Sequence, residues 1–158
     1  GLYNRRYFDE VLMFEWNRSL RKKTPLSIVL ADLDYFKKTN DQHGHLAGDE
    51  YLKASARMLK NVFKRKTDIV ARYGGEEFIV LMPDESGENA VELADKIRNR
   101  LERYQLEYDG QVVQTTLSLG VAGCIPAEGQ DPNYLISRAD TALYQSKADG
   151  RNRVTFSS

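Results

Sequence analysis

The stretch Arg72-Tyr73-Gly74-Gly75-Glu76-Glu77-Phe78 sets two adjacent carboxylates directly after a pair of glycines. Apolar runs rich in β-branched and aromatic residues flank it at residues 69–71 and 78–82. Two such runs joined by Gly-Gly predict a β-hairpin with a two-residue turn, in which both glycines adopt positive φ because other side chains resist it. A turn without side chains also leaves room for a phosphate. By itself, the stretch is also compatible with no binding site at all, with Gly-Gly as an ordinary turn and Glu76-Glu77 as the solvated start of a strand.

Composition limits the class of protein. The chain has 158 residues, of which 41% are hydrophobic, and this size suits one domain with its own core. Lysine plus arginine and aspartate plus glutamate both number 23, so no overall field attracts nucleic acid or an anionic membrane. We therefore expect a small-molecule ligand, no nucleic acid and no direct membrane contact.

The expected location is the cytoplasm. No run approaches the ~20 apolar residues of a membrane span, and the N-terminal residues lack the apolar core of a signal peptide. The lone Cys124 cannot form an internal disulfide and is expected to pack in the core. Because the chain starts abruptly at Gly1, we interpret residues 1–158 as a single domain excised from a longer, multidomain or membrane-anchored signalling protein.

The period of the apolar residues predicts the order of elements. Helices are expected at residues 5–22, 48–64, from Ser86 to about 104, and from 131 to Gly150; strands are expected at 26–33, 69–71, 78–82, 111–125 and 154–156. The middle of this order is a βαββαβ unit, in which helices cover one face of a largely antiparallel sheet. The sequence therefore predicts an α+β fold with a ferredoxin-like, palm-type core sheet and flanking helices.

Four carboxylates could converge in this fold. The first strand lies beside the central hairpin, so Asp32 and Asp34 at its end could meet Glu76 and Glu77. From the reference pKa values of isolated side chains, near ~4, we expect four ionised carboxylates whose repulsion calls for cations. Oxygen ligands select Mg²⁺ or Mn²⁺, which commonly bind together with substrate phosphates. Two histidines in a glycine loop, without cysteine partners, fall short of a zinc site.

The chain resembles the GGDEF family of diguanylate cyclases over essentially its whole length. The strings that carry the resemblance lie at residues 1–6, 32–41, 44–45, 48–49, 72–78, 118–121, 139–144 and 147–152. Each string alone is weak, but their order and spacing together are specific. The signature reads GGEEF here, with Glu76 where the family name has aspartate, so the carboxylate is kept.

The resemblance implies a reaction and its metal site. Two GTP molecules would condense to cyclic di-GMP and two pyrophosphates by two-metal phosphoryl transfer. Asp32, Glu76 and the backbone carbonyl of Leu33 would bind two Mg²⁺ (or Mn²⁺) ions per active site. Glu76 and Glu77 would be the catalytic carboxylates, with the identity of the general base left open. Catalysis would need a homodimer.

The resemblance also implies how GTP is held. The phosphates would contact the backbone amides of Tyr35, Phe36 and Lys37, together with the cations Lys147 and Arg151. Asn40 and Asp49 would bind guanine, and the residues close to the nucleotide would further include His45, Arg72, Gly74 and Gly75. An ionised Asp49 can accept from the N1–H and amino group of guanine, whereas adenine has an acceptor at N1, so this residue favours GTP chemically as well.

A second motif, Arg65-Lys66-Thr67-Asp68, is separated from Gly74 by five residues. In the family that the chain resembles, an Arg-x-x-Asp motif at this distance is the primary inhibitory site for the product. Arg65 and Asp68 would therefore bind cyclic di-GMP and inhibit the enzyme. Their spacing alone favours an i, i+3 salt bridge at a helix end.

Two other functions remain as alternatives. A catalytically silent GGDEF module could act as a receptor for GTP or cyclic di-GMP, although Asp32, Asn40, Glu76 and Lys147 are all present. A ferredoxin-like nucleic-acid binder would need a basic face and exposed aromatic residues on its sheet. The neutral charge and the absence of an RNP-like string disfavour it.

Overall fold

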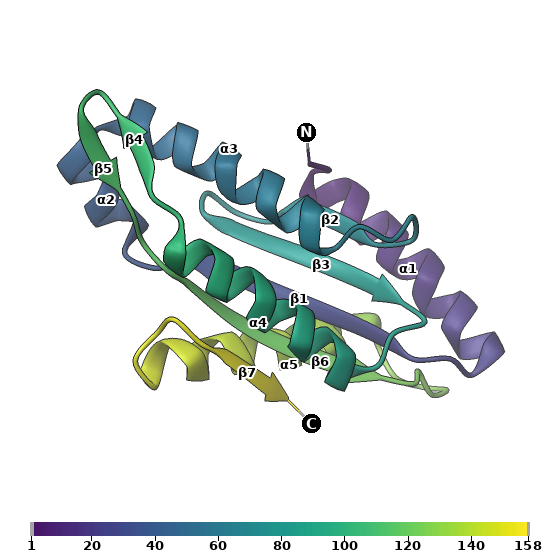
Figure 1. Cartoon of the computed structure of the whole chain (residues 1–158). Helices are drawn as coiled ribbons and strands as arrows, with labels where there is room; N and C mark the ends of the chain where they lie inside the picture. Colours follow the sequence, from purple (N-terminus) through teal and green to yellow (C-terminus); the bar gives the residue numbers. More distant parts are fainter. Residues whose placement is uncertain (1, 158) are drawn as a thin grey trace.

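The computed structural model describes residues 2–157, in which helices pack around a central β-sheet (Figure 1). The elements in chain order are α1 (Arg5–Lys22), β1 (Leu26–Leu33), α2 (Phe36–His43), α3 (His45–Val62), β2 (Ile69–Arg72), β3 (Glu77–Pro83), α4 (Gly87–Arg103), β4 (Leu106–Tyr108), β5 (Gln111–Val113), β6 (Leu117–Cys124), α5 (Pro132–Ala148) and β7 (Val154–Ser157). Within residues 2–157, no helix combines the length and apolar composition that a membrane crossing requires.

The central sheet has the strand order β2-β3-β1-β6-β7. β1 pairs antiparallel with β3 on one side and with β6 on the other, and β7 joins the edge parallel to β6. All eight residues of β1 are buried, because this strand is central and helices cover both faces of the sheet. The predicted α+β fold with a βαββαβ palm-type sheet is confirmed.

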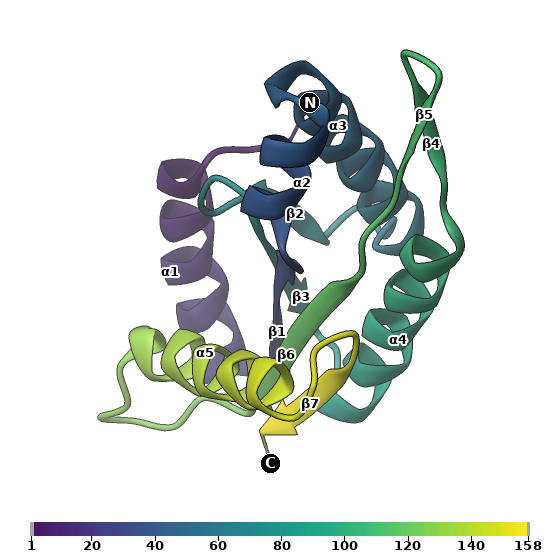
Figure 2. The same ribbon diagram turned by 90° about the vertical axis from the view of Figure 1, so that its left-hand side faces the viewer.

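Two apolar cores lie on opposite faces of the sheet. Val29, Ala31 and Leu33 of β1 belong to the core beneath α3 and α4, and Ile28 and Leu30 belong to the core beneath α1 and α5. This division follows from the two-residue period of a strand. Figure 2 shows α1 and α5 on one side of the sheet and α3 and α4 on the other. Within the βαββαβ unit the long helices do cover one face, and α1 and α5, which lie outside the unit, cover the second.

Several predicted elements are confirmed to within a few residues. The helix predicted at 5–22 is α1, and the strand predicted at 26–33 is β1. Ser86 caps α4 by accepting from the Asn89 amide, and Asp131 caps α5 by accepting from the Asn133 amide. Side-chain caps of this kind can be read from sequence because they act over two or three residues.

Three local predictions need correction. Residues 36–43 form helix α2 where a loop was expected, and α3 begins at His45 instead of residue 48. The N-cap of α2 is Tyr35, which makes no side-chain capping hydrogen bond, so the usual start signal is missing. Cys124 is half-buried at the edge of a core and not inside it, although burial still raises the pKa of its thiol.

The strand predicted at 111–125 is divided. β4 and β5 form a separate hairpin, closed by Asp109 and Gly110 with φ of 51° and 76°, as a type I′ turn requires. Between β5 and β6 the chain leaves the strand ladder and makes hydrogen bonds to side chains instead. The Thr115 amide donates to Tyr51 Oη, and Thr116 Oγ1 donates to the Asp34 carboxylate. The apolar pattern alone cannot show this break, because apolar residues lie on both sides of it: Val112 and Val113 before it, and Leu117, Leu119 and Val121 after it.

The Tyr51 hydroxyl links α3 to this break, and we expect its removal to weaken the fold. Tyr51 is fully buried, donates to the Thr115 carbonyl at 3.2 Å and accepts from the Thr115 amide at 3.2 Å; burial raises its pKa to about 12. Tyr51→Phe leaves two backbone groups without this partner, so the free energy of unfolding in urea should fall by roughly 1–3 kcal/mol.

The matched control is Tyr134→Phe, because Tyr134 is 55% exposed. The free energy of unfolding of Tyr134→Phe should stay within about 0.5 kcal/mol of the wild-type value. Equal losses in the two variants would show that the Tyr51 hydroxyl contributes nothing specific.

Candidate active site

The Gly-Gly turn is wider than predicted. The last ladder pair is Arg72 with Phe78, and the amides of Tyr73 and Gly74 both donate to the Glu77 carbonyl, at 2.8 and 3.3 Å. Neither glycine has φ in the left-handed region, so the predicted two-residue turn with positive φ is wrong. Gly74 instead leaves room for the Glu77 side chain, because a Cβ at Gly74 would lie 3.0 Å from Glu77 Oε2.

The side chain of Arg72, the last residue of β2, also contacts the turn. Its Nη2 donates to the Gly75 carbonyl at 2.5 Å. Gly75 itself is exposed, and a Cβ placed on it would meet no atom within 4 Å. The backbone of this turn is therefore accessible to a ligand.

The end of β1 adjoins this turn, as the sequence predicted. Asp32 faces Glu77 across the ladder, and the Leu33 amide donates to the Glu76 carbonyl at 3.2 Å. Burial raises the pKa of Glu77, and the negative charge of Asp32 raises it further, while Lys147 opposes the shift. Glu77 is thus a half-buried carboxyl that holds a proton more readily than an exposed one.

Asp32 has the free coordination that a metal site needs. It is 7% exposed, its Oδ2 contacts Lys147 Nζ, and its buried Oδ1 has no hydrogen-bond partner. A buried carboxylate oxygen without a partner is costly, and a hard cation would satisfy it. Within residues 2–157 no three histidine, cysteine or acidic side chains cluster around one point.

Asp34 does not join the other carboxylates, which corrects the expected convergence of four. It lies in the turn after β1, is fully buried, and accepts from Thr116 Oγ1 and Ser118 Oγ at 2.6 Å each. The Asn152 amide donates to it at 3.1 Å, and Arg151 Nη1 lies 3.7 Å away. These contacts occupy both oxygens and make Asp34 a structural anchor.

The N-terminus of α2 lies beside the predicted phosphate-binding cations. Tyr35 has φ of 53° and offers no side-chain cap, so the first-turn amides, including those of Phe36 and Lys37, face outward from the helix end. The Arg151 guanidinium lies 4.7 Å from the centre of the Tyr35 ring. The helix dipole and a nearby guanidinium favour an anion at this point.

The predicted guanine-binding residues lie where α2 ends and α3 begins. Asn40 lies directly against Gly48, where a Cβ would be 1.7 Å from Asn40 Oδ1. Asp49 follows Gly48 and is exposed, and so is His45, the first residue of α3. Gly48 therefore provides the room that the Asn40 carboxamide occupies.

The Arg65 motif is not on a helix, since α3 has ended before it. Arg65 Nε and Nη2 donate to Asp68 Oδ1 at 3.0 and 2.8 Å, and the Arg65 amide donates to Asp68 Oδ2 at 3.1 Å. Arg65 also donates to the Pro83 carbonyl at 2.9 Å. The Asp68 side chain is only 1% exposed, whereas Arg65 is 39% exposed and borders a cavity of about 330 Å³.

Sequence reasoning assigned no role to Asn152, Ser118 or Thr116, which fix Asp34. Ser118 and Asn152 occur in the strings that resemble the family, but nothing in a string says which distant residue it contacts.

Comparison with known proteins places this site in a family. The sequence model of the family described as diguanylate cyclase, GGDEF domain, matches residues 1–153. Diguanylate cyclase A of Treponema denticola is 42% identical over 154 residues, which are 96% of this chain and 41% of that protein. This chain thus spans less than half the length of that relative.

Solved structures agree with the sequence comparison. The GGDEF domain of DgcB from Caulobacter crescentus, in complex with c-di-GMP, gives a TM-score of 0.93 at 33% identity and covers 99% of this chain and 89% of that one. The active GGEEF domain of a diguanylate cyclase from Vibrio cholerae gives 0.92 at 33% identity and covers 100% and 99%. This chain therefore belongs to the GGDEF domain family of diguanylate cyclases, as its strings predicted.

Proposed function

We propose that this domain is a diguanylate cyclase, which joins two GTP molecules into cyclic di-GMP and releases two pyrophosphates. The observation that carries the proposal is the meeting of Asp32, with its unpartnered Oδ1, and the Glu76 turn at one end of the sheet. The uncapped start of α2 beside Arg151 supports an anionic substrate there. The names of the similar proteins support the same activity.

The chain's own residues would bind and orient GTP. The amides of Tyr35, Phe36 and Lys37 would donate to the phosphates, and Lys147 and Arg151 would balance their charge. Asn40 and Asp49 would hydrogen-bond to guanine, with His45 nearby. Arg72, by donating to the Gly75 carbonyl, would keep the Gly74-Gly75 turn in shape against the nucleotide.

Asp32, Glu76 and the Leu33 carbonyl would hold the divalent cations, and this all-oxygen set with the free Oδ1 fits Mg²⁺ or Mn²⁺. Two bound cations would supply charge neutralisation of the triphosphate and a more acidic 3′-hydroxyl. The 3′-oxygen of one GTP forms a bond to the α-phosphorus of the other, and the bond to the pyrophosphate oxygen breaks. Glu77 faces Asp32 across the ladder, and burial raises its pKa, so it is a candidate to accept the hydroxyl proton, and the identity of the general base stays open.

A symmetric product requires two sites that face each other, so the active unit in this proposal is a two-fold homodimer. We expect the specific activity to fall steeply as the protein is diluted. The measurement is initial rate against protein concentration, with light scattering on the same samples. A constant specific activity from a protein that is monomeric throughout would overturn the dimer.

Chromatography of a reaction of purified protein, GTP and Mg²⁺ tests the function itself. Cyclic di-GMP and pyrophosphate should appear in a ratio of one to two. Tight binding of GTP or cyclic di-GMP without turnover would instead support the silent receptor module.

Within this proposal the Arg65 motif is the product-inhibition site. Nε and Nη2 of Arg65 already donate to Asp68 and Pro83, so Nη1 of the partly exposed guanidinium would donate to a phosphate or to guanine. Arg65→Ala should weaken cyclic di-GMP binding about ten- to hundredfold, the equivalent of roughly 1.5–3 kcal/mol, with little change in the initial rate.

Arg65→Lys is the matched variant, because it keeps a charge near the buried Asp68 but loses the planar fork. Progress curves and calorimetry with cyclic di-GMP give the comparison. If all three proteins are inhibited equally, the motif is a structural ion pair alone.

A further inference from the structure

The turn after α5 has an unusual backbone. Arg151 and Asn152 have φ of 65° and 48°, so two consecutive residues that are not glycine lie in the left-handed region. Such residues persist there only where the surrounding contacts determine the conformation. In this turn, hydrogen bonds on both sides determine the left-handed conformation.

The inner contacts pin the backbone of the turn to a buried carboxylate. The Asn152 amide donates to Asp34 Oδ2 at 3.1 Å and to Ser118 Oγ at 3.2 Å. Asp34 is fully buried and cannot follow if the turn moves. Arg151, one residue earlier, lies 3.7 Å from the same carboxylate and extends over Tyr35.

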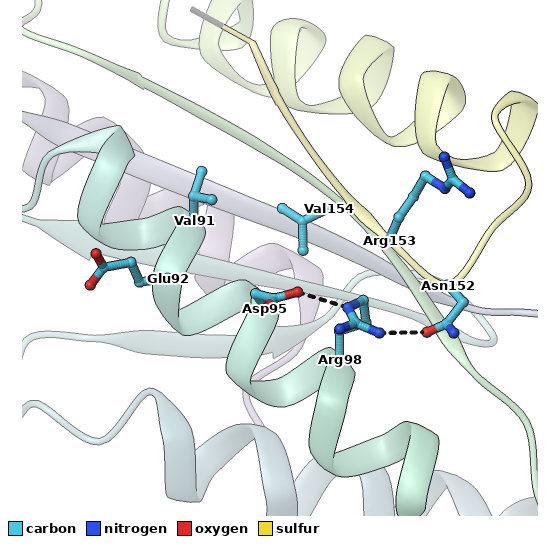
Figure 3. Close-up of a pocket in the computed structure, with 7 residues that line it drawn as sticks. All are labelled: Val91, Glu92, Asp95, Arg98, Asn152, Arg153 and Val154. Atoms are coloured by element: carbon cyan, nitrogen blue, oxygen red, sulfur yellow. Dashed lines mark hydrogen bonds and ion pairs between the residues drawn. The ribbon is translucent and has the colours of Figure 1, made fainter.

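The outer contacts hold the Asn152 side chain to α4. Arg98 Nη1 donates to Asn152 Oδ1 at 3.0 Å, and Asn152 Nδ2 donates to Glu102 Oε2. Arg98 is itself held by Asp95, whose Oδ1 accepts from Nε at 2.8 Å. Figure 3 shows Arg98 between Asp95 and Asn152. These three residues help to line a cavity of about 670 Å³.

We propose that Asn152 is a positioning residue, through which Arg98 and Glu102 of α4 fix the Arg151 guanidinium at the start of α2. The proposal rests on the proposed function, in which Arg151 contacts the nucleotide phosphates. A one-residue separation makes the coupling direct, because rotation of the Asn152 backbone moves Arg151.

The chemistry of the side chain explains why this position holds asparagine. A carboxamide presents an acceptor to Arg98 and a donor to Glu102 at the same time, which a carboxylate or an apolar side chain cannot do. Asparagine also tolerates the left-handed region better than most residues. Both requirements meet in one side chain.

The consequence is a link from the outer surface of α4 to the affinity for phosphate. The hydrogen bonds described for Arg98 and for the Glu102 carboxylate join them to each other, to Asp95 and to Asn152, so a change in either releases one side of the turn. Guanine recognition, at the other end of α2, does not depend on this turn.

The test uses two ligands that differ in their phosphates. The first is 3′-deoxy-GTP with Mg²⁺, which cannot condense because it lacks the attacking hydroxyl, and the second is GMP. Calorimetry gives both dissociation constants for wild type, Asn152→Gly and Arg98→Gln. Glycine keeps the left-handed backbone at 152 and deletes only the side-chain contacts. Arg100→Gln, at an exposed position of the same helix, is the matched control.

We expect the dissociation constant for 3′-deoxy-GTP to rise about tenfold in Asn152→Gly and about three- to tenfold in Arg98→Gln, because a charge-assisted phosphate contact is misplaced. The value for GMP should change less than about twofold, and Arg100→Gln should match wild type for both ligands. Arg98→Lys, which can still donate to Asn152 Oδ1, should recover part of the loss.

Two results would overturn the positioning role. Either both ligands weaken by the same factor, which would indicate a general loss of the fold, or neither changes. The proposed function fails separately, if wild type forms no cyclic di-GMP from GTP; the ratio of the two dissociation constants still decides the role of Asn152 in that case.

Discussion

Glu76→Gln should abolish the synthesis of cyclic di-GMP while the domain stays folded. The substitution keeps the size of the side chain but removes the charge that, with Asp32, would hold the divalent cations. Removal of one such electrostatic contact typically costs about 10²–10³-fold in turnover. Initial rates with GTP and Mg²⁺ measure the effect directly.

The position of Glu76 makes this a test of chemistry and not of folding. Its side chain is half-buried in a turn, and the bond that joins the turn to β1 uses its backbone carbonyl, which glutamine keeps. The free energy of unfolding should therefore stay within about 0.5 kcal/mol of wild type. Glu128→Gln, at an exposed loop position, is the matched control and should be fully active. Glu76→Gln activity within about threefold of wild type would remove Glu76 from the metal site.

Gly120→Ala should destabilise the domain strongly, although it adds only one methyl group. A Cβ at this position of β6 would lie 2.2 Å from the Ala139 carbonyl oxygen and 2.3 Å from the Leu143 nitrogen. Both atoms belong to the backbone of α5, which cannot yield as a flexible side chain can. The helix would have to move away from the sheet, and we expect a loss of about 3 kcal/mol or more in the free energy of unfolding.

Gly75→Ala provides the comparison for stability. A Cβ there meets nothing within 4 Å, and the residue is outside the left-handed region, so the free energy of unfolding should change by less than about 0.5 kcal/mol. Urea unfolding of both variants gives the difference. A Gly120→Ala variant within about 1 kcal/mol of wild type would show that α5 can shift at little cost.

Much of the fold could be predicted because its signals are local. The apolar period of α1, the unbroken apolar run of β1 and the helix starts predicted at Ser86 and residue 131 each depend on a few neighbouring residues, and these elements are confirmed. The neighbourhood of Asp32 and the Gly-Gly turn followed from strand order alone. The identity of the family followed from the order and spacing of short strings.

The sequence by itself thus determined the main helices, the sheet and the end of the sheet where the candidate site lies. The tertiary structure alone decided that Asp34 turns to Thr116 and Ser118, 82 and 84 residues away, and that Asn152 joins it from 118 residues away. It also decided that residues 36–43 form a helix without a side-chain cap. The physical reason is the same in each case: hydrogen bonds and close packing between distant segments fix these positions, and they leave no periodic signal in the chain.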